Sequence, residues 1–178
     1  MILNQQRRVR VSIAGLNKFL AAAQKRLRLP ADSLAVALVT DRQMARWNAA
    51  YRGKNQPTDV LSFPADGPHP HSAKIRESGR SVRRRASKRK RVGKFKRPGA
   101  FSSHSFTSSP SSTSYLGDIA IAPAVARRNA LRFGRTFNHE MRVLILHGVL
   151  HLMGYDHETD QGQMTRRENR LRRDLGLS

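Results

Sequence analysis

The segment RVLILHGVLHLMGYDH, residues 142–157, sets the central element of the predicted fold. Its residues 142–153 have apolar side chains on nearly every side of a helix, so we expect a buried helix here. His147 and His151 are four residues apart, which puts both imidazoles on one helix face with about 6 Å between them along the axis. Burying both without a partner would cost free energy, and a bound metal ion removes that cost.

A third histidine completes the pattern. His157 lies ten residues beyond His147, and a continued helix would carry it away from the first two histidines. Gly154 is placed to end the helix in the left-handed conformation and to turn the chain back. The pattern His-x3-His-x2-Gly-x2-His predicts three nitrogen ligands and one open position, which is typical of catalytic zinc sites. We therefore predict one Zn²⁺ per chain, with a metal-bound water on His147, His151 and His157 as the reactive group.

The residue after the first histidine argues against a peptidase. Zinc peptidases have a glutamate there as general base, whereas this chain has Gly148. Asp156 precedes the third histidine and is a candidate to orient a histidine ligand. Asp118 lies inside a predicted strand, where we expect a structural hydrogen-bonding role, with orientation of a ligand as the alternative.

The remaining pattern predicts a mixed α+β fold. Strands and helices follow one another without strict alternation, which favours a small mixed β-sheet of about four strands packed with about five helices. We expect a single domain, residues 1–178. The metal site lies at the C-terminal end of the buried helix. The predicted strands span residues 9–15, 34–40, 60–63 and 116–121, and the predicted helices span 16–27, 41–51, 123–133, 142–153 and 163–175.

The charge is concentrated in one segment. The chain has a formal net charge of +22, and residues 67–114 contribute +12 of it through 13 basic residues and one acid, Glu77. This segment is too polar to offset the entropy of ordering, so we predict a disordered insertion at about 68–113. Its arginine and lysine runs are candidates for binding RNA phosphates: Arg83, Arg84, Arg85, Lys88, Arg89, Lys90 and Arg91.

Composition excludes some classes of protein. The chain has no cysteine, which rules out disulfides and thiolate metal sites. It also has no apolar run of the roughly 20 residues that cross a bilayer. We expect a cytoplasmic protein without a membrane partner, and the pattern leaves the oligomeric state open.

Three blocks of the sequence resemble the YbeY family of bacterial rRNA-maturation endoribonucleases. They are HGVLHLMGYDH (147–157), YRGKNQPTDVLSFP (51–64) and LGDIAIAP (116–123). The order of the elements also agrees over most of residues 8–67 and 114–178. The chain departs from the family in its long basic, serine-rich insertion, where relatives have a short connection.

This resemblance implies zinc on the three histidines and a catalytic Arg52 facing the metal cleft. It also implies single-strand-specific cleavage of RNA in maturation of the 16S rRNA 3′ end and in ribosome quality control. The expected partners are single-stranded RNA, rRNA and the small ribosomal subunit. A non-catalytic ribosome-assembly factor with a structural metal remains the alternative, because Gly148 supplies no proton acceptor.

Overall fold

A computed structural model describes residues 1–65, 115–157 and 160–177, which form a mixed sheet with helices on both faces. Strands β1, β2 and β4 are parallel, and β3 is antiparallel at one edge, in the order β1-β2-β4-β3. The predicted α+β class, with four strands and five helices among these residues, is confirmed. The elements are β1 (Ile2–Asn4), α1 (Ile13–Leu27), β2 (Leu34–Leu38), α2 (Asp41–Arg52), β3 (Val60–Pro64), β4 (Gly117–Ile121), α3 (Pro123–Arg132), α4 (Phe137–Leu152) and α5 (Gln163–Asp174).

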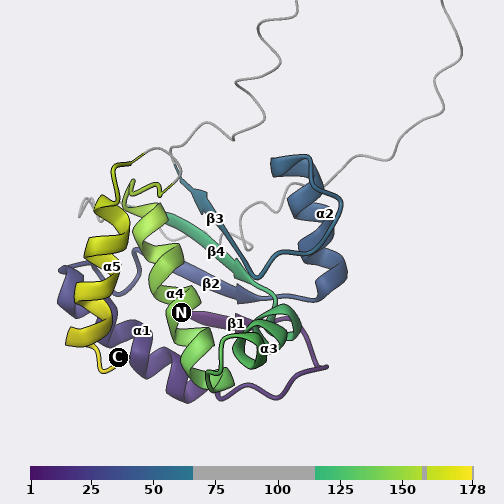
Figure 1. Cartoon of the computed structure of the whole chain (residues 1–178), viewed down its shortest axis with the longest axis horizontal. Coiled ribbons are helices and arrows are strands. Elements are labelled where there is room, and N and C mark those ends of the chain that lie inside the picture. Colours follow the sequence, from purple (N-terminus) through teal and green to yellow (C-terminus); the bar gives the residue numbers. More distant parts are fainter. Residues whose placement is uncertain (66–114, 158–159, 178) are drawn as a thin grey trace, which may run out of the picture.

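Strand alternation divides the core between two faces of the sheet. Val36 and Ile119 are paired across β2 and β4 and point to the face that α4 covers. Ala37 and Ala120, one residue further along each strand, point to the opposite face and pack with Met44 of α2. Figure 1 shows α1, α4 and α5 together on one side, with α2 apart from them beyond β3. The helix that carries two of the histidines therefore lies directly against the sheet.

Helix α4 begins earlier than the sequence predicts. It starts at Phe137 instead of residue 142 because Thr136 caps it, accepting a hydrogen bond from the backbone N–H of His139. The extra turn contains Glu140, a buried acid whose carboxylate contacts Arg135 at 3.2 Å. The apolar pattern alone did not reveal this turn, because its polar residues find partners through the fold.

Gly148 sets the distance between α4 and the sheet. A Cβ atom at this position would lie 2.8 Å from Cγ2 of Ile119 and 3.0 Å from its Cδ1, closer than such atoms approach. The same turn of the helix is bonded to the edge strand, since Ser62 Oγ donates to the carbonyl oxygen of Gly148 at 3.2 Å. A side chain at this position would force either Ile119 or the helix to shift.

The strand predicted at residues 9–15 is wrong. The first strand is β1, and residues 13–15 instead begin α1. The backbone of Val9 is satisfied by a side chain instead of a neighbouring strand: Gln6 accepts from the N–H of Val9 and donates to its carbonyl oxygen, both at 2.9 Å. These local hydrogen bonds replace the bonds that a neighbouring strand would make with Val9.

Helix α1 begins three residues before the predicted start at residue 16, and the remaining predicted elements agree with the structure to within two residues at each end. The predicted insertion at about 68–113 lies outside the described residues. In the described part of the chain, no helix combines the length and the apolar character needed to span a bilayer.

Replacing Gly148 with alanine should destabilise the fold by about 1–3 kcal/mol, because the new methyl group must displace a fully buried side chain. The measurement is the free energy of unfolding in urea. Gly15→Ala in α1 is the matched control, since its Cβ would meet only the side chain of Ser12, with the hydroxyl at 3.1 Å, and that side chain can rotate. Equal stability of the two variants would contradict the close contact.

Candidate metal centre

The three histidines gather at the C-terminal end of α4. His147 and His151 lie in the last two turns of the helix, and His157 follows it. Their ring centroids are 4.7 Å apart for the first pair, and His157 lies 5.3 and 5.2 Å from His147 and His151. One nitrogen from each ring lies within 4.8 Å of the others. The group can therefore hold a metal ion.

The end of α4 returns the chain to the helix. Gly154 has a φ of 87°, in the left-handed region that favours glycine. Its N–H donates to the carbonyl oxygen of His151 at 3.0 Å, and the N–H of Tyr155 donates to that of Leu150 at 3.1 Å. These two bonds form the Schellman motif, which reverses the chain within two residues. The turn carries His157 back beside the helix.

Glu168 on α5 orients the first histidine. Its Oε2 lies 3.1 Å from Nδ1 of His147, and Arg172 donates to Oε1 at 2.5 Å. The carboxylate is buried, and with both oxygens engaged its position is fixed. A carboxylate on the outer nitrogen of a histidine selects the tautomer and raises the basicity of the inner nitrogen. Glu168 therefore leaves Nε2 of His147 with its lone pair toward the other two rings.

Sequence reasoning missed Glu168, although a signal was present. Helix α5 buries Met164, Glu168 and Leu171, which recur at offsets of four and three residues. An acidic residue on the buried stripe of an otherwise basic helix needs a partner. The pattern could have singled out Glu168, but only the docking of α5 on α4 identifies His147 as that partner.

The spacing of the nitrogens fits a tetrahedral ion. The Nε2 atoms of His147 and His151 are 3.1 Å apart. Two nitrogens bound to one zinc ion at about 2.05 Å in tetrahedral geometry lie about 3.3 Å apart. The two rings therefore need little movement to share an ion, and the residues present fit the expected metal.

The electrostatics favour neutral imidazole and charged carboxylate. Burial lowers the pKa of His151, and the neighbouring His147 and His157 lower it further. Burial raises the pKa of Glu168, but the hydrogen bond from His147 and the charge of Arg172 outweigh it, so that the pKa is lowered overall. Neutral imidazole is the form that binds a metal, and an ionised Glu168 is the form that accepts from His147.

The other predicted site residues lie in different places. Asp156 lies beside the third histidine, its Oδ1 3.8 Å from Nδ1 of His157. Asp118 accepts from the hydroxyl of Tyr115 at 2.6 Å, and its position in β4 faces the side of the sheet opposite α4. Arg52 is the exposed last residue of α2. The predicted RNA-binding residues at 83–91 lie outside the described part of the chain.

Replacing Glu168 with glutamine should weaken metal binding about 10- to 100-fold, because the charge that supports His147 is lost while the side chain keeps its size. The measurement is competition for Zn²⁺ against a coloured chelator. Asp174→Asn is the matched control on α5, where it removes only the exposed ion pair with Arg26. Unchanged affinity in the glutamine variant, or an equal loss in both, would refute this role.

Comparison with known proteins supplies the family. The family model described as endoribonuclease YbeY matches residues 1–176. An endoribonuclease YbeY of Solibacter usitatus is 34% identical over 148 residues, covering 83% of this chain and 67% of the relative. One from Rhodopseudomonas palustris strain HaA2 is 36% identical over 81% of this chain, which spans only 58% of that relative's length.

The chain is also similar to a solved structure. The solution structure of TM1509 from Thermotoga maritima superposes with a TM-score of 0.49 at 20% identity, covering 98% of this chain and 89% of that one. The family assignment comes from the family model, whose match over residues 1–176 spans the segment that contains the three histidines. The chain belongs to the YbeY endoribonuclease family.

Proposed function

We propose that this chain is a zinc-dependent endoribonuclease that cuts single-stranded RNA in the cytoplasm. Its expected role is maturation of the 16S rRNA 3′ end and quality control on the small ribosomal subunit. The observation that carries the proposal is the convergence of three histidine nitrogens within 4.8 Å in a member of this family. The support that Glu168 gives to His147 is typical of a metal ligand.

His147, His151 and His157 would hold the ion. When bound, zinc supplies Lewis acidity toward a phosphoryl oxygen and lowers the pKa of a water molecule toward neutrality. The chain positions its ligands: Glu168 fixes His147, and the turn at Gly154 fixes His157. Three protein ligands leave a fourth position open, which favours a catalytic over a structural ion.

The packing of Gly148 argues against a peptidase. In zinc peptidases the general base occupies this position. Here the position faces Ile119, and even a Cβ atom would lie 2.8 Å from its Cγ2. Any proton acceptor must come from another residue, from substrate or from solvent.

We propose that Arg52 binds the scissile phosphate. A guanidinium can hold two phosphate oxygens at once and neutralise the charge that grows as the phosphodiester breaks. Two features support this role: Arg52 is exposed at the end of α2, and Gly53 follows it with a φ of 69°, which ends the helix. The edge strand β3 contacts both the helix that carries two of the histidines and the helix that carries Arg52. Ser62 of β3 bonds to α4, and Phe63 contacts Tyr51 of α2 with ring centroids 4.9 Å apart.

The first test is cleavage of a single-stranded RNA with the sequence of a 16S 3′ end. We expect His151→Ala to abolish cleavage, because it removes one of three ligands. His139→Ala is the control on the same helix, since His139 lies in its first turn, away from the cluster. The two proteins should be prepared identically and assayed with added Zn²⁺ and with a chelator.

Each outcome separates the candidates. Cleavage by the wild type and by His139→Ala, lost in His151→Ala and in chelator, supports the metallonuclease. Equal cleavage by all three proteins would indicate a contaminant and would refute the assignment. A wild type that binds zinc and RNA but cuts nothing would favour the assembly factor with a structural metal.

Replacing Arg52 with lysine should lower kcat about 10- to 1,000-fold while zinc affinity stays unchanged, because lysine keeps the charge but loses the forked contact. The measurement pairs steady-state cleavage with zinc competition. Arg46→Lys is the matched control, since Arg46 is an exposed arginine within α2. Equal kcat in both variants would rule out a phosphate role for Arg52.

A further inference from the structure

Two large apolar side chains near the end of α3 lie open to solvent. Leu131 is 78% exposed and Phe133 is 54% exposed. Among the described residues, the other exposed large hydrophobic residues are Met1, the first residue, and Tyr115, whose hydroxyl is bonded to Asp118. Leu131 and Phe133 have no such explanation. Single exposed apolar side chains are common on protein surfaces, so these two gain meaning only from the groups beside them.

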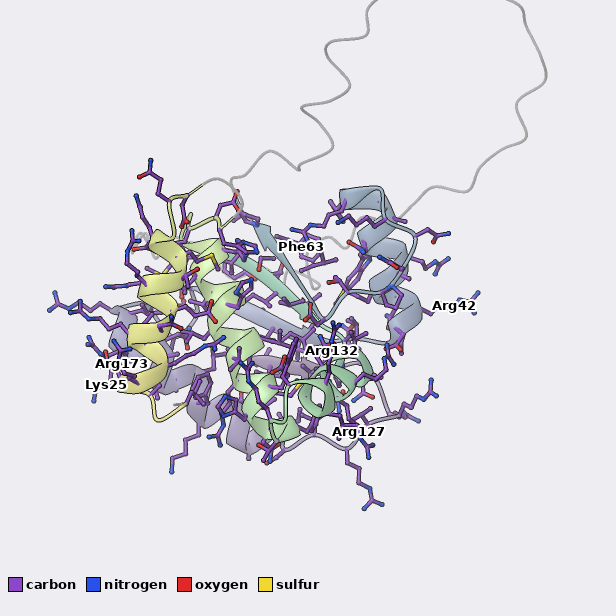
Figure 2. The ribbon with its side chains drawn as sticks, in the orientation of Figure 1. Lys25, Arg42, Phe63, Arg127, Arg132 and Arg173 are labelled. Carbon is purple, nitrogen blue, oxygen red and sulfur yellow. The ribbon has the colours of Figure 1, made fainter. Side chains whose placement is uncertain are left out.

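Arginines lie beside each of these two side chains. The Cζ atom of Arg132 lies 5.8 Å from the centre of the Phe133 ring, and that of Arg135 lies 5.5 Å from it. Arg127 is one helical turn before Leu131 and shares its side of α3. Figure 2 shows Arg127 and Arg132 on this helix. We call these five residues the Phe133 surface.

The Phe133 surface keeps unneutralised positive charge. Arg135 contacts Glu140 at 3.2 Å. In the described part of the chain, Arg127 and Arg132 form no ion pair with an acidic residue. Exposed contacts between a guanidinium and a ring are weak, so Arg132 can turn from the ring to a ligand. The surface therefore offers an aromatic face and free cations side by side.

We propose that the Phe133 surface is a second contact for single-stranded RNA, separate from the histidine cluster. This inference rests on the proposed function. An unpaired base can stack on the Phe133 ring or on an arginine plane, while Arg127 and Arg132 bind the flanking phosphates. Double-stranded RNA offers no such base, because its bases are stacked inside the helix.

The size of the apolar area favours RNA over a protein partner. A stable protein interface buries about 1,000 Å² or more around an apolar core. Two exposed apolar side chains among arginines do not provide such a core. The chain's formal net charge of +22 also favours a polyanion.

The surface and the histidine cluster lie at opposite ends of α4. The Phe133 surface precedes Phe137, the first residue of α4, whereas His147 and His151 lie in its last two turns. Over these 10 to 14 residues a helix rises about 15–21 Å. At a spacing of roughly 3.4 Å for stacked nucleotides, that distance corresponds to about four to six nucleotides. A stacked RNA strand that reaches both places must exceed this length.

The test measures binding to a fluorescent 12-nucleotide single-stranded RNA with 2′-O-methyl groups, which resists cleavage. Phe133→Ala in the full-length protein should raise the Kd about 5- to 100-fold, because a stacking face is lost. Phe133→Trp should restore binding. Arg132→Ala should reduce the slope of binding against salt by about one, whereas Phe133→Ala should leave the slope unchanged. Arg173→Ala on α5 is the control for an exposed arginine elsewhere.

RNA length supplies the second readout. A trinucleotide bound at the histidine cluster should bind Phe133→Ala and wild type equally. An unchanged Kd for the 12-mer in Phe133→Ala would overturn the proposal, as would equal affinity for duplex RNA. Competition by polyglutamate that matches single-stranded RNA would also overturn it, in favour of an acidic protein partner.

These readouts do not depend on catalysis. If Phe133→Ala loses binding although the wild type cuts no RNA, the Phe133 surface stands and the nuclease assignment fails. If cleavage depends on His151 while Phe133→Ala binds normally, the nuclease assignment stands and the surface is refuted.

Discussion

The close contact between α4 and β4 at Gly148 is the constraint on which the rest of the structure depends. With no side chain at this position, the helix approaches Ile119 closely enough for Ser62 of β3 to bond its backbone. His147 precedes this contact and His151 follows it by less than one turn. The position of both imidazoles relative to the sheet is therefore set by van der Waals contact within a densely packed core, which resists displacement.

The same contact occupies a position that has a different role in peptidases with a related histidine spacing. There, the residue after the first histidine carries the general base. Here, that residue is Gly148, whose lack of a side chain allows α4 to pack against the sheet, so the position cannot also carry a general base. The buried carboxylate beside the histidines comes instead from α5, where Glu168 contacts His147.

Two regions of the surface have different character. Around the histidines the side chains are partly buried and bonded to one another, as suits a rigid site. At the end of α3, Phe133 and the arginines beside it are exposed and joined only by weak contacts. The two proposals give these regions complementary roles, a rigid centre for chemistry and an adaptable surface for a flexible polyanion, with α4 between them.

The sequence by itself determined the fold class, most elements and the three histidines, because these depend on short-range spacing. A four-residue interval places His147 and His151 on one face, and a glycine three residues later reverses the chain. Tertiary structure alone decided three matters: that Gln6 takes up the backbone of Val9 in place of a strand, that Gly148 meets Ile119, and that Glu168 meets His147. The physical reason is that periodicity shows which face of a helix is buried. Which residues that face contacts depends on how elements far apart in the sequence pack together.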